Sequence, residues 1–358
     1  MDENPYRKLA DRLNALPNGF PPAPDGAELR LLAKLFTPEE AALAAQLRMT
    51  RETAQQIAAR IGGDPQTLRK QLKRMASGGL IAAGRAEGGL GYGLLPFVVG
   101  IFEAQGDTID AELARLFEDY YRQAFGQSLQ VRPAVHRVVP VGESVRQGLE
   151  TRPFESVAAI LAEAKAWGVN DCICRKQQAL LGKPCGHPID ICMVVSQTPG
   201  AFDNSPEVHA LTLDQAMATL RRAAEAGLVH SVTNNQKGVW YICNCCTCGC
   251  AVLRGIRDLG LGSVVAPSGF VCAVDADVCV ACGLCVDRCQ FGALSMDIIA
   301  QVDDQRCVGC GVCTLACPDK ALSLMPRPVA EQVTPPETEE DWRRLRAEAR
   351  GLDMEAVR

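Results

Sequence analysis

Residues 271–296 read VCAVDADVCVACGLCVDRCQFGALSM, and residues 300–325 read AQVDDQRCVGCGVCTLACPDKALSLM. Both segments contain the spacing C-x2-C-x2-C-x3-C, and each cysteine of the first run lies 28 positions before its counterpart in the second. Asp275 and Asp303 are related by the same offset. The two segments are therefore an internal repeat whose unit is built around four cysteines.

The spacing within each run predicts an iron–sulfur site. A 4Fe–4S cluster needs four thiolates that converge tetrahedrally, and one tight loop supplies three of them from positions i, i+3 and i+6. The same loop cannot fold back to the fourth corner, so the fourth thiolate must come from another part of the chain. Gly283, Gly309 and Gly311 suit loops whose backbone turns sharply. Zinc knuckles are the alternative, which we do not favour because two runs at this spacing are a specific signal.

The repeat resembles the two-cluster bacterial ferredoxins, in which the fourth cysteine of each run binds the other cluster. The resemblance implies a first cluster on Cys279, Cys282, Cys285 and Cys317. It implies a second cluster on Cys307, Cys310, Cys313 and Cys289. Pro318 follows Cys317 as in the ferredoxin pattern, but Gln290 follows Cys289. We expect Gln290 to alter the surroundings of the second cluster without removing it.

The bulk composition is that of a globular protein with an unusual number of cysteines. The chain has 358 residues, enough for two or three domains, with 47% hydrophobic residues and a net charge of -5. This charge argues against a role of the whole protein on nucleic acid or a membrane surface. All eighteen cysteines follow residue 171 and gather in tight runs, unlike a disulfide framework. The N-terminal segment MDENPYRKLADRL lacks the apolar region of an export signal, so we expect a cytoplasmic protein whose reduced thiols bind metal.

The fold class predicted from the whole sequence is α+β. Residues 1–27 are rich in proline and are predicted to be an extended leader. Helical spacing of apolar residues predicts three or four helices between residues 28 and 79, with Thr50 and Asp64 as N-caps. The glycine-rich segment GLIAAGRAEGGLGYGLLP at residues 79–96 predicts a β-hairpin.

This order of helices followed by a hairpin resembles a winged helix-turn-helix domain over residues 28–100. In DNA-binding members the third helix enters the major groove, and here that helix carries Arg69, Lys70, Lys73 and Arg74. DNA is therefore one partner to consider, but we favour docking to protein, because exposed basic residues on a helix are commonly a solvated face.

Residues 101–268 are predicted to form a mixed α/β, helical and cysteine-rich domain. Two helices and a strand are expected before residue 170, and we interpret His136 as structural and Tyr120, Tyr121 and Phe125 as core residues. A strong amphipathic helix is predicted over residues 214–227, and a shorter one over residues 251–260. The ferredoxin-like domain then occupies residues 269–326. Residues 327–358 are predicted to be a linker with a charged C-terminal helix.

Nine further cysteines lie in the segments DCICRKQQALLGKPCGHPIDIC, residues 171–192, and CNCCTCGC, residues 243–250. Thiols this dense are prone to oxidation without a ligand, so we interpret them as metal ligands. The set is Cys172, Cys174, Cys185, Cys192, Cys243, Cys245, Cys246, Cys248 and Cys250. Because their spacing does not match a zinc ribbon, we expect one or two additional 4Fe–4S clusters; zinc and a redox-active thiol set are the alternatives.

The sequence leaves the grouping of these nine cysteines open. The simplest grouping puts Cys172, Cys174, Cys185 and Cys192 on one site. The other pairs Cys172 and Cys174 with members of the 243–250 run. We interpret His187 as a loop histidine, with a cluster ligand or proton donor as the alternative. Cys272 is interpreted as a spare buried thiol.

The motifs DCICR, GLVH and ICNCCTCGC resemble a group of ferredoxin-like iron–sulfur proteins of anaerobic bacteria, and this resemblance implies a redox role without naming a substrate. No dinucleotide-binding or P-loop motif occurs in a suitable context, and no catalytic residues are assigned. We therefore predict an electron-transfer protein that passes low-potential electrons to or from a partner oxidoreductase, and regard it more as a component of such a system than as an independent catalyst. The alternatives are a redox-sensing DNA-binding regulator and a reductase with a catalytic cluster in the middle domain.

Overall fold

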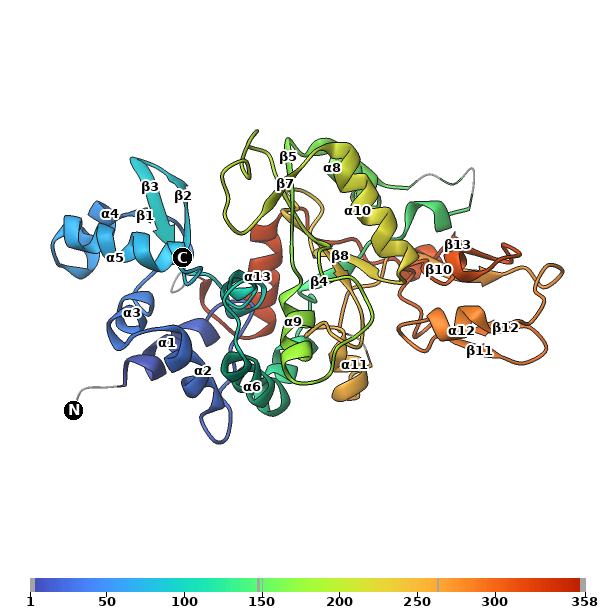
Figure 1. Ribbon diagram of the computed structural model, residues 1–358, viewed down its shortest axis with the longest axis horizontal. Helices are drawn as coiled ribbons and strands as arrows, with labels where there is room; N and C mark the ends of the chain where they lie inside the picture. The colour runs from blue at the N-terminus through green and yellow to red at the C-terminus, as the bar shows by residue number, and fades with distance from the viewer. Residues whose placement is uncertain (1–3, 147–148, 150, 263, 355–358) are drawn as a thin grey trace. The chain divides into compact units, whose positions relative to one another are not determined.

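The computed structural model describes residues 4–146, 149, 151–262 and 264–354. The chain divides into two compact units, of which unit 1 comprises residues 1–131, 176–183 and 343–358 and unit 2 comprises residues 132–175 and 184–342. Both units contain helices and antiparallel strands (Figure 1), which confirms the predicted α+β class. The finer domain boundaries predicted from the sequence stay predictions.

Unit 1 is mainly helical. Its α-helices are α1 (Pro5–Asn14), α2 (Ala27–Leu35), α3 (Pro38–Ala44), α4 (Ala54–Ile61), α5 (Pro65–Ser77), α6 (Ala111–Tyr120) and α7 (Gly126–Gln130). Its strands β1 (Glu52–Thr53), β2 (Ala82–Ala86) and β3 (Gly89–Gly93) form a sheet in the order β1-β3-β2. The predicted hairpin is present as β2 and β3. Aromatic side chains fill the core, with the rings of Phe102 and Phe117 stacked 3.8 Å apart and Tyr120 fully buried.

The prediction of an extended leader over residues 1–27 is wrong for the part that the structure describes. Pro5–Asn14 form α1, which begins where the Asn4 side chain accepts a hydrogen bond from the Tyr6 amide, with Pro5 in the first turn. Leu9 and Leu13 lie four residues apart on the buried face of this helix. The prolines that suggested an extended segment all follow α1, from Pro17 onward.

The N-cap of α4 is Thr53, not Thr50 as predicted. The Thr53 hydroxyl accepts from the Gln56 amide, and the Gln56 side chain accepts from the Thr53 amide at 2.7 Å, so the two residues form a capping box. Asp64 caps α5 as predicted, because its carboxylate accepts from the Thr67 amide at 2.8 Å.

Unit 2 is organised around a six-stranded antiparallel sheet. Its strands, in spatial order, are β4 (His136–Val138), β8 (Val229–Thr233), β9 (Tyr241–Cys245), β6 (Cys192–Ser196), β5 (Ala166–Asn170) and β7 (His209–Leu211). Helices α8 (Val157–Glu163) and α10 (Leu213–Glu225) bury Leu161, Ala216 and Leu220 against Met193 and Ile242 of the sheet. His136 is buried and its ring lies 5.5 Å from that of Tyr241.

The cysteine repeat forms two small antiparallel sheets. Strand β10 (Phe270–Val274) pairs with β13 (Leu322–Pro326), and β11 (Leu294–Met296) pairs with β12 (Ala300–Val302). Strands β10 and β12 both lie at the start of a repeat, and β11 and β13 both lie at the end of one. Each sheet therefore joins the start of one repeat to the end of the other. Helix α12 (Leu284–Arg288) lies beside β11 and β12 (Figure 1).

Three further α-helices occur in the described chain. Helix α9 (Ile173–Leu180) follows β5 and was not predicted, and α13 (Glu339–Ala349) is the expected charged C-terminal helix. The helix predicted over residues 251–260 is reduced to the five residues of α11 (Arg254–Asp258). Among the described residues, every helix is too short or too polar to cross a membrane.

Candidate metal centres

The eight cysteines of the repeat separate into two groups of four. Cys279, Cys282 and Cys285 of the first run line one cavity together with Cys317 of the second run. A second cavity is lined by Cys307, Cys310 and Cys313 of the second run together with Cys289 of the first. We call these groups the outer quartet and the inner quartet, respectively. Three thiols of each quartet therefore come from one tight loop, and the fourth comes from the other run.

Equivalent backbone hydrogen bonds begin the two cysteine loops. The amide of Cys279 donates to the carbonyl of Asp275 at 3.0 Å, and the amide of Cys307 donates to the carbonyl of Asp303 at 2.9 Å. Asp275 in turn donates from its own amide to Ala321, the residue that precedes β13. The repeated aspartates therefore hold the start of one loop against the end of the other repeat.

The fourth cysteines receive backbone hydrogen bonds at their sulfur atoms. The amide of Ala293 donates to Cys289 Sγ, and the amide of Ala321 donates to Cys317 Sγ, both at 3.3 Å. These amides stabilise negative charge on sulfur, which a cluster ligand carries. The donor set and its hydrogen bonds therefore fit a pair of iron–sulfur clusters.

Two glycines of the inner loop have no room for a side chain. Gly309 and Gly311 both have positive φ, +66° and +79°. A Cβ on Gly309 would meet the carbonyl oxygen of Phe270, and one on Gly311 would meet the Ser144 side chain. The backbone of this loop can approach its neighbours only because both residues are glycine.

The two quartets differ in their exposure. The outer quartet includes the exposed Cys282, and Val280, between two of its cysteines, is 64% exposed. In the inner quartet Cys310 and Cys313 are buried. Burial raises the pKa of Cys310 well above its ordinary value, so this thiol is a poor anion until a cation binds.

Cys272 is buried as predicted, but it is not remote from the ligands. Its Sγ lies 3.7 Å from Cys313 Sγ, and it lines the cavity of the inner quartet. This contact is the first cause of the raised pKa of Cys313.

Comparison with known protein families agrees with this geometry. Residues 273–295 and 300–323 match the family described as 4Fe-4S binding domain. Residues 273–323 form a ferredoxin-type domain. No curated protein matches the chain.

Upstream of the ferredoxin-type domain, six cysteines gather at one end of the large sheet. Cys172 lies in hydrogen-bonding contact with Cys174 and Cys192, and Cys250 contacts Cys174 and Cys245. Cys243 joins the group through Cys245. The group, which we call the six-cysteine cluster, is Cys172, Cys174, Cys192, Cys243, Cys245 and Cys250. Hydrogen bonds from Cys174 and Cys192 hold the pKa of Cys172 well below its usual range.

Strand order explains why these six cysteines meet. Strands β9, β6 and β5 are neighbours and run antiparallel to one another, so the end of β9, the start of β6 and the end of β5 share one edge. Cys243 and Cys245 end β9, Cys192 begins β6, and Cys172 follows β5. The simplest predicted grouping, with Cys185 beside Cys172, Cys174 and Cys192, is wrong because residues 184–188 belong to a separate loop that carries Cys185 to different partners.

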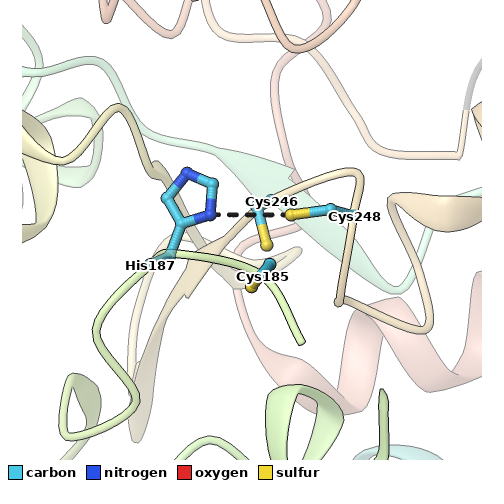
Figure 2. A group of neighbouring side chains, drawn as sticks. All are labelled: Cys185, His187, Cys246 and Cys248. Carbon is cyan, nitrogen blue, oxygen red and sulfur yellow. Dashed lines mark hydrogen bonds between the residues drawn. The ribbon is translucent and has the colours of Figure 1, made fainter. Parts of the chain in front are cut away.

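Those partners form a second, more compact group. The ligand atoms of Cys185, His187, Cys246 and Cys248 all lie within 4.8 Å of one another (Figure 2). Cys185 and His187 belong to the loop between α9 and β6, and the other two belong to the turn after β9. His187 Nδ1 lies 3.5 Å from Cys248 Sγ, so our interpretation of His187 as an ordinary loop histidine is not supported. The signal in the sequence was its position two residues after Cys185.

Arg175 lies between the two upstream groups. Its side chain is 3% exposed, and its two terminal nitrogens donate to the carbonyls of Pro188 and Asn244 at 2.8 and 2.6 Å. Its charge interacts with Cys172 and Cys246, one from each group. Within the described residues its Nε has no hydrogen-bond partner.

Gln290, the residue that departs from the ferredoxin pattern, connects the inner quartet to the upstream cysteines. Its Oε1 accepts from both the amide and the hydroxyl of Thr247, at 3.1 and 2.9 Å, and its Nε2 donates to the Gly227 carbonyl. Gln290 directly follows Cys289, and Thr247 lies between Cys246 and Cys248. Proline at position 290 would make none of these bonds.

Unit 2 also contains a cavity of about 530 Å³. It is lined by residues of α8 and α10, by Glu143 and by the buried His230. His230 Nδ1 faces the Asn244 side-chain oxygen at 2.6 Å, and burial lowers the pKa of His230. Leu315, between Cys313 and Cys317 in sequence, forms part of the wall.

In unit 1, the predicted DNA-contacting residues all lie on α5. All four are exposed, and Arg74 also forms an ion pair with Glu40 at 3.1 Å. The assignment of residues 28–100 as a winged helix stays a prediction.

Proposed function

We propose that this protein transfers low-potential electrons through iron–sulfur clusters to or from a partner oxidoreductase in anaerobic metabolism. The observation that best supports this proposal is the composition of the two quartet cavities. Each is lined by three cysteines of one run and the fourth cysteine of the other. The outer quartet would hold one 4Fe–4S cluster and the inner quartet a second. Such a cluster, when bound, accepts and releases single electrons.

The chain's own groups set the conditions for that exchange. The thiolates hold the clusters, and the amides of Ala293 and Ala321 donate to sulfur and so favour the more negative, reduced state. Two cysteines of the inner quartet, Cys310 and Cys313, are buried, whereas the outer quartet includes the exposed Cys282. We therefore assign the outer quartet as the site of exchange with the partner.

The surface around the outer quartet supports docking of a protein. Val280 and Leu284, 64% and 49% exposed, flank the exposed Cys282. Seven aspartates against three basic residues occur in residues 273–323. An apolar patch within an acidic domain fits a partner with a basic rim, whose association should weaken as salt is added.

Hydrogen bonds also connect the inner quartet to the upstream cysteines. The Gln290–Thr247 hydrogen bonds join the residue after Cys289 to the turn that precedes Cys250. We propose that four thiols of the six-cysteine cluster hold a third 4Fe–4S cluster, which makes residues 172–317 a chain of three electron carriers.

Pairs of substitutions test the crossed quartets. Cys285→Ser/Cys317→Ser alters one quartet, so we expect it to cost about four irons per chain, no more than either single change. Cys285→Ser/Cys289→Ser alters two ligands of one run but both quartets, and should cost about eight irons. Equal losses from the two double variants would contradict the crossed arrangement.

Substitution in the six-cysteine cluster tests the third carrier. Cys172→Ser/Cys174→Ser should remove about four irons and leave the electron paramagnetic resonance signals of the reduced ferredoxin-type domain unchanged. Loss of all iron would contradict separate sites, and no loss would show that the cluster of thiols binds no iron.

The exposed basic residues of α5 support a second candidate function, a redox-sensing regulator that binds DNA through a winged helix. Arg69, Lys70 and Lys73 would contact phosphate, and such contacts weaken steeply with salt. Titration of duplex DNA at two salt concentrations tests it, with Lys70→Glu/Lys73→Glu as the variant that should abolish binding. Absence of salt-dependent affinity in the unaltered protein would exclude this function.

A further inference from the structure

We propose that Cys185, His187, Cys246 and Cys248 form a mononuclear tetrahedral metal site, of the kind that holds zinc, and that this site is separate from the iron–sulfur clusters. The inference goes beyond electron transfer and does not depend on it. It departs from the expectation that all nine upstream cysteines serve iron–sulfur clusters.

The spacing of the ligand atoms distinguishes one ion from a cluster. With metal–ligand bonds of about 2.0–2.3 Å, the ligands of a tetrahedral zinc ion lie about 3.5–3.8 Å apart. The thiolates around a 4Fe–4S cluster lie on a larger tetrahedron, about 6 Å on an edge, because four irons and four sulfides stand between them. All four ligand atoms here are within 4.8 Å of one another, and the His187–Cys248 pair is at 3.5 Å. This volume suits a single ion and is too small for a cluster.

Comparison of this group with the other cysteine groups of the chain supports its assignment to a single ion. Among the described residues, only this group of metal-ligating side chains is so compact. The outer and inner quartets, which match a cluster-binding family, do not converge to that degree. In the six-cysteine cluster thiols contact one another in pairs, but among the described residues no three of them all lie within 4.8 Å of one another. The chain therefore presents one closely spaced ligand set and three wider ones.

The identity of the ligands selects the ion. Three thiolates and one imidazole form a Cys3His set, which occurs at structural zinc sites and leaves no open position on a tetrahedral ion. Soft thiolates disfavour magnesium and calcium. Figure 2 shows the four side chains gathered together, with the His187 ring facing Cys248, and two side chains come from each of two loops.

Charge around the site is balanced by arginine. A zinc ion with three thiolates and a neutral histidine carries one net negative charge. The buried guanidinium of Arg175 interacts with Cys246, and the half-exposed Arg257, which is paired with Asp258, also interacts with Cys248. The Nε of Arg175, which has no partner among the described residues, is a donor suited to a thiolate.

The site would join two loops that the six-cysteine cluster needs in place. Residues 184–188 lead into β6 and Cys192, and the turn after β9 leads to Cys250. A bound ion would tie these loops together, so it would have a structural role.

Elemental analysis of the full-length protein purified without oxygen tests the proposal. We expect about one zinc per chain in addition to iron. His187→Ala should lose the zinc and keep the iron of the ferredoxin-type domain. His187→Cys, which restores a fourth soft ligand, should keep both. His209→Ala, which removes an exposed histidine outside every cysteine group, is the matched control and should also keep the zinc.

Cobalt provides a second readout that does not depend on electron transfer. Protein produced with cobalt in place of zinc should show the visible absorption bands of a tetrahedral cobalt thiolate, and these bands should be absent in Cys185→Ser. The proposal is wrong if the unaltered protein binds neither zinc nor cobalt. It is also wrong if His187→Ala still loses about four irons in the Cys172→Ser/Cys174→Ser background, where the six-cysteine cluster is already altered, because the group itself would then hold iron–sulfur. Failure of electron transfer alone would leave the zinc result intact.

Discussion

At the scale of single residues, the proposed function depends on positions where only glycine fits. Gly309 and Gly283 have similar positive φ, +66° and +79°, but different surroundings. A methyl group on Gly309 collides with the Phe270 carbonyl, whereas nothing lies within 4 Å of the corresponding position on Gly283. We expect Gly309→Ala to lose about four irons per chain, and the matched control Gly283→Ala to keep all iron and lose about 1 kcal/mol of stability. Full iron content in Gly309→Ala would contradict this prediction, because the loop would then have moved to accommodate the methyl group.

His136 should make unit 2 sensitive to acid. Burial lowers its pKa from 6.5 to about 4, and its Nε2 has no hydrogen-bond partner among the described residues. The folded form keeps His136 neutral, whereas the unfolded form takes up a proton below about pH 6.5. The contribution of neutral His136 to the free energy of unfolding is therefore fully present above pH 6.5 and is lost as the pH falls toward 4. Between pH 7 and 5.5 the loss from this histidine should be about 1 kcal/mol.

Amide hydrogen exchange of β4 and β8, corrected for the intrinsic pH dependence of exchange, measures this change in opening free energy. His136→Phe keeps a ring beside Tyr241 but cannot titrate, so its opening free energy should change less with pH than that of the unaltered protein. Identical pH dependence in both proteins would contradict the assignment to His136, since His230 is present in each.

At the scale of secondary-structure elements, the sequence predicted single helices and hairpins better than it predicted which elements pack together. The capping residue Asp64, the β2–β3 hairpin and the amphipathic helix α10 are all found close to their predicted positions, because each depends on neighbouring residues. Helix α1 was missed because the prolines that follow it dominated the composition of residues 1–27. The cap of α4 was misplaced by three residues, because Thr50 and Thr53 both precede a helical pattern.

The two threonines provide a paired test of the α4 cap. Thr53→Ala removes the acceptor for the Gln56 amide and should destabilise the helix by about 1 kcal/mol. Thr50 is exposed and lies outside the capping box, so Thr50→Ala should change stability by less than about 0.5 kcal/mol. Amide exchange in α4 measures both effects. The reverse order of effects would restore the original assignment of Thr50.

Gln290 offers a test of the connection between the inner quartet and the upstream turn. Gln290→Ala removes the acceptor of the Thr247 amide, so this amide should exchange at least about fivefold faster. The iron content should not change, because the ligands remain. Gln290→Glu keeps an acceptor oxygen but loses the donor to Gly227, and should have a smaller effect. Unchanged protection of Thr247 in Gln290→Ala would show that this contact does not hold the turn.

At the scale of the whole molecule, the sequence predicted the ferredoxin-type domain because its ligands follow a local spacing that is repeated after 28 residues. It did not predict the division of the nine upstream cysteines. That division depends on the order β9-β6-β5, which brings Cys172, Cys192 and Cys243 together, and on the loop that carries Cys185 away. Strand order is a long-range property, and the spacing of cysteines carries no record of it.

The central claim is that the chain holds several low-potential electron carriers, and a reductive titration tests it most directly. Protein purified without oxygen should contain about twelve irons and twelve acid-labile sulfides and accept about three electrons per chain, one for each cluster. Two of the three reduced signals should belong to the ferredoxin-type domain and persist in Cys172→Ser/Cys174→Ser. A protein with its full complement of iron that accepts no electrons at low potential would contradict the account.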